Sequence, residues 1–139
     1  MGLIVDTCEF VDLERQGGTP ATIIHRYATH QDYGVSTMTI AELQHGVRRA
    51  DGERRRRFRE QFLRDVLKSF PIYPLDSGIA LRLGDLDAEL QMLGRKRQIP
   101  DLIIAATALE LGYEVATRNV DHFSHIPGLR IATPLPIVS

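Results

Sequence analysis

The chain contains one cysteine, Cys8, among its 139 residues. A single thiol excludes an internal disulfide, and sparse cysteine is typical of proteins in the reducing cytoplasm. No apolar run approaches the roughly 18 residues that a membrane-spanning helix needs, so we expect no membrane association. The first residues form an apolar strand pattern directly, without the basic and apolar segments of a secretory signal. We therefore expect a cytoplasmic protein.

An excess of charge of one sign is absent as well, because the net charge is −1. The total gives no sign of a polyanion-binding protein, but the basic residues are clustered. Nine of them lie between Arg48 and Lys68, and Arg95, Lys96 and Arg97 form a second group. The first cluster has acidic neighbours at helical spacing. Three interpretations of it stay open: a self-paired solvated face, an RNA-binding surface, and a contact with a protein partner.

Short apolar segments alternate with helical patterns along the chain. With 43% hydrophobic and 25% charged residues, the composition is that of a globular domain. The patterns favour strands over residues 2–6, 34–38, 72–75, 113–116 and 129–132. They favour helices over residues 7–16, from 19–20 onward, and over 39–47, 51–70, 77–94 and 101–111. This alternation predicts one three-layer α/β/α domain over residues 1–139, with a mainly parallel central sheet.

Apolar stripes on the two longest helices predict which faces are buried. The charged helix over 51–70 carries the stripe Phe58, Phe62, Leu63, Val66 and Leu67. The helix that begins at Asp76 and Ser77 carries Ile79, Leu81, Leu83, Leu86, Leu90 and Leu93. Residues 101–111 are apolar almost all round, which predicts a helix buried on every side.

Three acidic residues stand where we expect a strand to meet a helix. Asp6 follows Leu3-Ile4-Val5, Glu42 follows Thr39-Ile40-Ala41, and Asp101 precedes the apolar helix. Junctions beyond the carboxyl ends of parallel strands face one crevice, where ligands bind. Carboxylates gathered there would repel one another by about 3 kcal/mol per pair at roughly 5 Å and an effective dielectric near 20. Mg²⁺ or Mn²⁺, which prefer oxygen ligands, would remove that repulsion, so the sequence predicts a metal site for phosphate chemistry.

Each acid also has a simpler interpretation. Asp is common where strands turn, which suffices to explain Asp6. Thr39-Ile40-Ala41-Glu42 fits a capping box, in which the Glu42 side chain would accept a hydrogen bond from the backbone amide of the N-cap residue Thr39. Asp101 would complement the positive end of its own helix. The metal-site hypothesis therefore depends on the three occurring together in one small sheet.

A fourth polar position follows the strand that ends at Ala116. Asn119, Asp121 and His122 lie in the turn after that strand, and each could face the same crevice. Asn119 stands nearest to the strand, Asp121 carries the charge, and a lone histidine is more often a surface residue. The sequence leaves the choice among them open.

Several ordered motifs resemble one known family. They are Ile4-Val5-Asp6-Thr7, Thr39-Ile40-Ala41-Glu42-Leu43 with Gly46, Asp101 through Ala108, Thr117-Arg118-Asn119 through Phe123, and Pro127-Gly128-Leu129. In combination and order they resemble the PIN-domain ribonucleases, and most closely the VapC toxins of bacterial toxin–antitoxin pairs. The resemblance runs over nearly the whole chain.

The resemblance implies a PIN-like sheet and a Mg²⁺-dependent endoribonuclease, with Mn²⁺ able to substitute. Its first three acids fall on Asp6, Glu42 and Asp101. Asp6 and Asp101 would bind the metal directly, and Glu42 directly or through water. The fourth acid of many members falls on Asn119, a departure that leaves Asp121 and His122 as alternatives. It further implies a structured RNA substrate, such as a tRNA or rRNA loop, a VapB-type antitoxin and a homodimer.

The second basic cluster is placed to serve that chemistry. Arg95, Lys96 and Arg97 lead directly toward Asp101, so we expect them to hold the RNA backbone beside the metal. The alternative function is a PIN-like domain that binds RNA or a protein partner without cutting. Asp6, Glu42 and Asp101 argue against that alternative, whereas Asn119 in place of an acid keeps it open.

Overall fold

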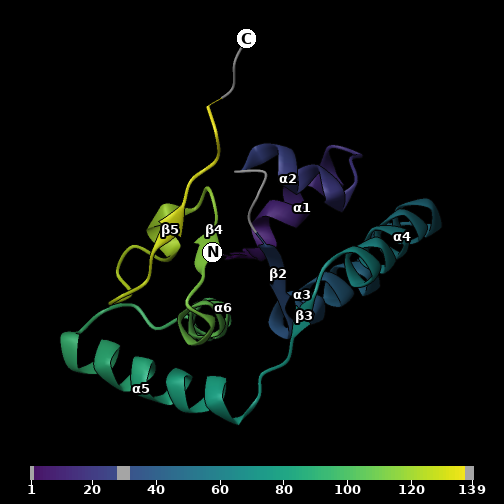
Figure 1. The fold of residues 1–139 in the computed structure, drawn as a ribbon. Helices are drawn as coiled ribbons and strands as arrows, with labels where there is room; N and C mark the ends of the chain where they lie inside the picture. The colour runs from purple at the N-terminus through teal and green to yellow at the C-terminus, as the bar shows by residue number, and fades with distance from the viewer. Residues whose placement is uncertain (1, 28–31, 137–139) are drawn as a thin grey trace.

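A five-stranded sheet forms the centre of the molecule (Figure 1). The structure is a computed structural model that describes residues 2–27 and 32–136. The strands run in the order β3-β2-β1-β4-β5 and all neighbours are parallel. Their bounds are β1 Gly2–Val5, β2 Asp32–Ser36, β3 Ile72–Tyr73, β4 Glu114–Ala116 and β5 Ile131–Ala132. The parallel α/β fold expected from the sequence is confirmed, and β3 lies at an edge as its flanking prolines predict.

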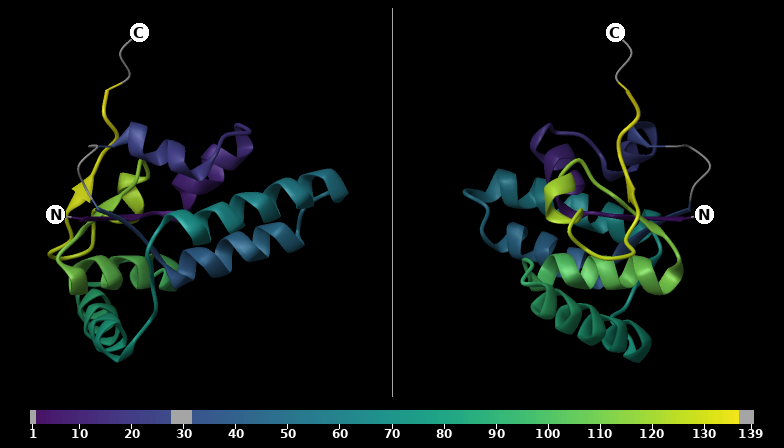
Figure 2. Two further views of the ribbon diagram at one scale, coloured as in Figure 1. Left: turned by 45° about the vertical axis from the view of Figure 1, so that its right-hand side comes forward. Right: turned by 90° about the vertical axis from the view of Figure 1, so that its left-hand side faces the viewer.

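In the described part of the chain, six α-helices connect and cover these strands. They are α1 Thr7–Arg15, α2 Ile23–Arg26, α3 Thr37–Arg48, α4 Glu53–Ser69, α5 Ser77–Leu93 and α6 Ile99–Leu111. Two short 3₁₀ helices, η1 Pro20–Thr22 and η2 Val120–His122, lie beside α2 and after β4. Helices α3 and α4 pack together and extend from one side of the molecule (Figure 2). Within the part of the chain that the structure describes, no helix combines the length and apolarity needed to cross a bilayer.

Alternation along β1 divides the core into two clusters. Leu3 and Val5 point to one face and pack with buried residues of α1, α2 and α4, including Phe10 and Phe62. Ile4 points to the other face and packs with buried residues of α5 and α6. Because successive side chains of a strand point to opposite faces, a run of three apolar residues serves both layers. The result is the expected three-layer arrangement.

The start of α3 differs from the expectation. The strand ends at Ser36 and the helix begins at Thr37, whereas residues 34–38 were expected to be extended. The Ser36 hydroxyl accepts a hydrogen bond from the Met38 amide at 3.1 Å, so Ser36 is the capping residue. The proposed capping box of Thr39 and Glu42 is therefore wrong, because both residues lie inside the helix.

Two expected apolar stripes are only partly buried. On α4, Phe62, Leu63 and Val66 are buried, but Phe58 and Leu67 are 40% and 48% exposed. On α5, Ile79, Leu86 and Leu90 are buried, whereas Leu81 and Leu93 are 73% and 50% exposed. Each helix packs on one side of a layer, so a stripe wider than the contact extends into solvent. Helix α6 is buried along most of its length, as expected, from Leu102 to Ala108.

Asp101 does not follow a strand. It lies in the first turn of α6, which α5 and the connection over residues 94–98 precede. Helix α6 leads through Gly112 into β4, so it runs antiparallel to the strands. Its first turn therefore reaches the edge of the sheet at which the strands end. The expectation of a strand–helix junction at this position was wrong, although the edge of the sheet was correctly predicted.

Candidate active site

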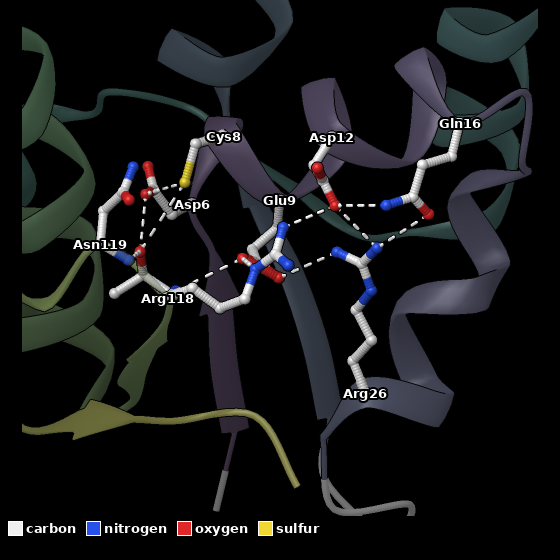
Figure 3. A network of polar contacts seen from close by, with 9 residues as sticks. Asp6, Cys8, Glu9, Asp12, Gln16, Arg26, Arg118 and Asn119 are labelled. Atoms are coloured by element: carbon white, nitrogen blue, oxygen red, sulfur yellow. Dashed lines mark hydrogen bonds and ion pairs between the residues drawn. The ribbon is translucent and has the colours of Figure 1, made fainter. Parts of the chain in front are cut away.

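Asp6 stands at the end of the central strand β1. Its amide donates to the Ala116 carbonyl at 3.0 Å, which continues the pairing of β1 with β4 by one residue. The side chain is buried, and its Oδ2 accepts hydrogen bonds from the Thr117 hydroxyl at 2.8 Å and the Cys8 thiol at 2.7 Å (Figure 3). Burial and then the charge of Asp6 raise the pKa of Cys8, so this thiol stays protonated and acts as a donor.

Glu42 lies in α3 and is held by hydroxyl groups. The Thr7 hydroxyl donates to Glu42 Oε1 at 2.7 Å. The same Thr7 oxygen lies 2.8 Å from the buried Thr39 hydroxyl. Thr7 follows Asp6 directly in the chain, so its hydrogen bond with Glu42 connects the end of β1 to helix α3.

Asp101 approaches from the opposite layer. Its Oδ2 lies 3.7 Å from His122 Nδ1, at a distance that makes an ion pair when the imidazole is protonated. The Asp101 side chain is 22% exposed and that of His122 is 54% exposed. Asp101, Glu42, His122 and Lys96 together border a cavity of about 260 Å³, which Gln98 and Pro100 complete.

The three acids lie close enough to influence one another's protonation. Burial raises the pKa of Glu42, and the charges of Asp6 and Asp101 raise it further. Burial likewise raises the pKa of Asp101; His122 opposes this shift, whereas the charge of Asp6 adds to it. Every pair among the three therefore shows like-charge repulsion. A cluster of this kind favours a proton or a cation in its midst.

The donor chemistry fits a hard divalent cation, because all three side chains offer carboxylate oxygens. On Asp6 both hydrogen bonds go to Oδ2, and among the described residues Oδ1 receives none. As the side chains stand, no group of three or more His, Cys, Asp or Glu residues within 2–27 and 32–136 is arranged so that it could hold a metal ion. A bound ion would therefore need side-chain movements or water ligands between the ion and the carboxylates.

The candidates for the fourth position occupy different places. The backbone amide of Asn119 donates to the Thr117 hydroxyl at 2.9 Å. The side chain of Asn119 points the same way as that of Asp6 (Figure 3). His122 lies beside Asp101. Asp121 is exposed on η2, and no contact among the described residues joins it to the three acids. Asn119 and His122 therefore border the acid cluster from two sides.

The second basic cluster is split among three environments. Arg97 makes two hydrogen bonds with Asp87, at 2.8 and 3.1 Å. Arg95 donates to the His125 carbonyl at 2.9 Å. Only Lys96 borders the cavity of Glu42 and Asp101. A local sequence pattern could not separate these three, because their partners lie about ten or more residues away.

The first basic cluster is partly self-paired. Glu53 pairs with Arg56 at 3.8 Å and with Arg57 at 3.4 Å. Arg59 instead reaches across to Glu14 of α1 at 2.9 Å and to the Gly46 carbonyl at 2.7 Å. Some charged side chains of α4 therefore pair within the helix, and Arg59 instead binds residues of the neighbouring helices α1 and α3.

Four residues around the site were not anticipated. The hydroxyls of Thr7 and Thr117 donate to Glu42 and Asp6, the Thr39 hydroxyl contacts that of Thr7, and the buried Glu9 anchors the chain next to Thr117. Short hydroxyl side chains gave no signal in the sequence. Glu9 did carry one: it lies four residues before the apolar Leu13, and so on the face of α1 that is expected to be buried.

Comparison with known proteins identifies the family. Residues 3–129 match the PIN domain. The chain is 33% identical over 139 residues to Ribonuclease VapC1 of Rickettsia felis, and the match covers 96% of each. A solved structure of VapBC2 from Rickettsia felis, bound to a DNA fragment from its promoter, is similar with a TM-score of 0.81 at 22% identity, covering 96% of this chain and 98% of that one. A toxin–antitoxin complex from Klebsiella pneumoniae is similar with a TM-score of 0.66 at 28% identity, covering 98% and 100%. The chain therefore belongs to the PIN-domain family and, within it, to the VapC ribonucleases.

Proposed function

We propose that this protein is a Mg²⁺-dependent endoribonuclease, with Mn²⁺ able to replace Mg²⁺. The observation that carries the proposal is the cluster of Asp6, Glu42 and Asp101, in which each pair repels. Maintaining three carboxylates in a partly desolvated site is unfavourable for folding, and a bound cation turns that repulsion into attraction. Membership of the VapC ribonucleases supports the same reaction.

The proposed roles follow from position. Asp6 and Asp101 would bind the metal directly, and Glu42, which accepts a hydrogen bond from Thr7, would bind it directly or through a water molecule. When bound, the ion would lower the pKa of a water molecule and neutralise charge on the scissile phosphate. Asn119 supplies an amide oxygen beside Asp6. Asp121 is retained only as an outer member of the site, because it is exposed and further along the turn.

The proposed substrate is a structured RNA that presents an unpaired loop, such as a tRNA or rRNA loop. A small crevice can admit single-stranded RNA, whose bases are free of a helix. Of the three predicted phosphate-binding residues, Lys96 is the best placed, since Arg95 and Arg97 already have partners on the protein. His122, when protonated, would add a second positive charge at the same cavity.

We further propose a VapB-type antitoxin as the partner that inhibits the site. The similar structures from Rickettsia felis and Klebsiella pneumoniae are a VapBC complex and a toxin–antitoxin complex. A homodimer, which the family resemblance implied, is also proposed, and sedimentation velocity of the purified protein would refute it by finding only monomer. The cytoplasmic location stays a prediction.

Expression of Asp6→Asn tests the function most directly. This substitution removes a metal ligand while leaving the basic residues in place, so RNA binding should persist and cutting should fall by at least about 100-fold. In cells, the wild-type protein should arrest growth, Asp6→Asn should not, and a co-expressed antitoxin should restore growth. Purified protein, stripped with EDTA and resupplied with Mg²⁺, gives the matching assay in vitro. Equal cutting by Asp6→Asn and wild type would refute the role of Asp6 as a metal ligand, and a wild type that cuts no RNA when Mg²⁺ is resupplied would leave the non-catalytic binding module.

A further inference from the structure

Glu9 is a fully buried carboxylate that the catalytic proposal does not use. Its relative exposure is 0%, and it lies on α1 only three residues after Asp6. Two arginines from different segments neutralise it: Arg26 of α2 contacts Oε1 at 3.3 Å, and Arg118 contacts Oε2 at 3.0 Å. Asp12, one turn further along α1, binds both arginines as well (Figure 3). Two acids and two bases thus form one network, to which Gln16 adds hydrogen bonds with Asp12 and Arg26.

The contact with Arg118 involves the backbone as well as the guanidinium. Glu9 Oε2 accepts from the Arg118 amide at 3.3 Å and from Arg118 Nε at 3.0 Å. One carboxylate oxygen therefore holds both the main chain and the side chain of the same residue. Such a pair of bonds fixes the direction of the chain at Arg118 and not merely the charge near it.

Arg118 connects two residues of the candidate site. Before it, the buried Thr117 donates from its hydroxyl to Asp6 Oδ2 at 2.8 Å. After it, the Asn119 amide donates to the same hydroxyl at 2.9 Å. The pairing of β4 with β5 ends at Thr117, whose amide donates to the Ala132 carbonyl at 3.2 Å. Beyond that bond, the direction of the chain toward Asn119 depends on the Thr117 hydroxyl and on Glu9.

We propose that Glu9 is a positioning residue that fixes the turn 117–119, and through it the placement of Asp6 and Asn119. The importance of this role for cutting rests on the proposed nuclease function. Because Glu9 has no exposed surface, it reaches neither RNA nor a metal ion in the crevice, and Arg118 is the residue through which it contacts the turn of the candidate site. Arg118 itself is a poorer test, since its side chain is 44% exposed and could meet the substrate.

The competing explanation is that Glu9 only stabilises the fold. A buried ion pair can be removed at a cost to stability without any effect on geometry elsewhere. The two roles differ in which amides they protect. A purely structural Glu9 would protect the whole sheet edge equally, whereas a positioning Glu9 protects the amides of Arg118 and Asn119 in particular.

Amide hydrogen exchange by NMR distinguishes these roles. In Glu9→Gln, which keeps the size of the side chain and loses its charge, the Arg118 and Asn119 amides should exchange at least about 10-fold faster than in the wild type. The Thr117 amide, bonded to Ala132, should keep its wild-type rate. Glu9→Leu, which also removes the acceptor, should show a larger change at the same two amides. Equal acceleration of all three amides, or of none, would overturn the proposal.

Kinetics on a single-stranded RNA with Mn²⁺ provide the second measurement. If Asp6 and Asn119 are misplaced, kcat should fall by about 10-fold in Glu9→Gln and by up to about 100-fold in Glu9→Leu. KM should change by less than about two-fold in both variants. The matched control is Glu14→Gln, which breaks the ion pair between Glu14 of α1 and Arg59. This variant should keep the wild-type kcat. Folded Glu9 variants with wild-type kcat would overturn the role in cutting. If the wild type itself cuts no RNA with metal, the proposed function fails, and the exchange pattern alone decides whether Glu9 positions the turn.

Discussion

Two effects oppose the negative charges of Glu42 and Asp101. Burial comes first for both, and the neighbouring acids add to it. Asp101 also lies in the first turn of α6, where the positive end of the helix favours a negative charge. Its pKa is nevertheless raised, so desolvation and repulsion outweigh the helix end. In the absence of metal, this charge therefore opposes folding.

The raised pKa of Asp101 predicts how the stability of the fold depends on pH. A carboxyl whose folded-state pKa is raised binds protons more readily when folded, so stability is lost as the pH rises through the raised pKa. Asp101→Asn should therefore raise the Tm of the metal-free protein at pH 7, by about 2–4 °C for each kcal/mol relieved. The gain should disappear below about pH 4, where Asp101 of the wild type is protonated as well.

Asp87→Asn is the control with the opposite sign. The hydrogen bond from Arg97 lowers the pKa of Asp87, so this substitution should not raise the Tm at pH 7. Thermal denaturation of both variants in EDTA between pH 4 and pH 8 makes the comparison. A lower Tm for Asp101→Asn at pH 7 would contradict the assigned repulsion.

The sequence indicates the three acids that the structure brings together in the candidate site, but it does not indicate the residues that hold them. Asp6, Glu42 and Asp101 are distinctive because acidic residues interrupt apolar segments. Thr117, by contrast, supports Asp6 across 111 positions of the chain. A hydroxyl that becomes important only through such a distant contact has no local pattern. Arg97 illustrates the same limit, since no local pattern indicates its pairing with Asp87.

In helix α3, which residue caps the first turn determines where Glu42 lies in the helix. Ser36 and Thr39 are both good capping residues, and only Thr39 is followed at the right distance by a glutamate. The structure uses Ser36, because the pairing of β2 with β3 ends there and the chain must turn. Glu42 therefore does not cap the helix, and its carboxylate accepts a hydrogen bond from the Thr7 hydroxyl at the candidate site.

Substitution of the cap tests this assignment. Ser36→Ala should cost about 1 kcal/mol, because the Met38 amide loses its acceptor at the start of α3. The Tm should fall by about 2–4 °C, and the Met38 amide should exchange faster. Thr39→Val removes a hydroxyl that bonds to Thr7 instead, so Met38 should keep its exchange rate. The opposite pattern, with Met38 sensitive to Thr39 and not to Ser36, would restore the capping box.

Buried helix faces were predicted less well than helix positions. The pattern placed α4 and α5 correctly to within about two residues, which is the usual limit of boundary assignment. It could not show that Leu81 and Leu93 of α5 point into solvent, since their exposure depends on how α5 lies against α6. Apolar periodicity identifies a face of a helix, and the neighbouring elements decide how much of that face is covered.

For the whole molecule, the proposed metal site links ion binding to folding. A ligand that binds only the folded state stabilises it by about 2.7 kcal/mol at one hundred times its dissociation constant. Saturating Mn²⁺ should therefore raise the Tm of the wild type by about 5–10 °C. Asp6→Asn should lose most of this response, and Asp87→Asn, away from the site, should keep it. Identical melting curves for the wild type with and without saturating Mn²⁺ would count against the metal site.

The parallel sheet also sets the order in which the parts of the site come together during synthesis. Strand β1 pairs on one side with β2 and on the other with β4, where Leu3 lies opposite Glu114. As the ribosome extends the chain, Asp6 and Glu42 are made early, but Asp101, Thr117 and Asn119 belong to its last third. The growing polypeptide therefore holds only two of these five residues for most of translation. If the protein cuts RNA as proposed, this order spares the ribosome and the message that produce it until synthesis is nearly complete.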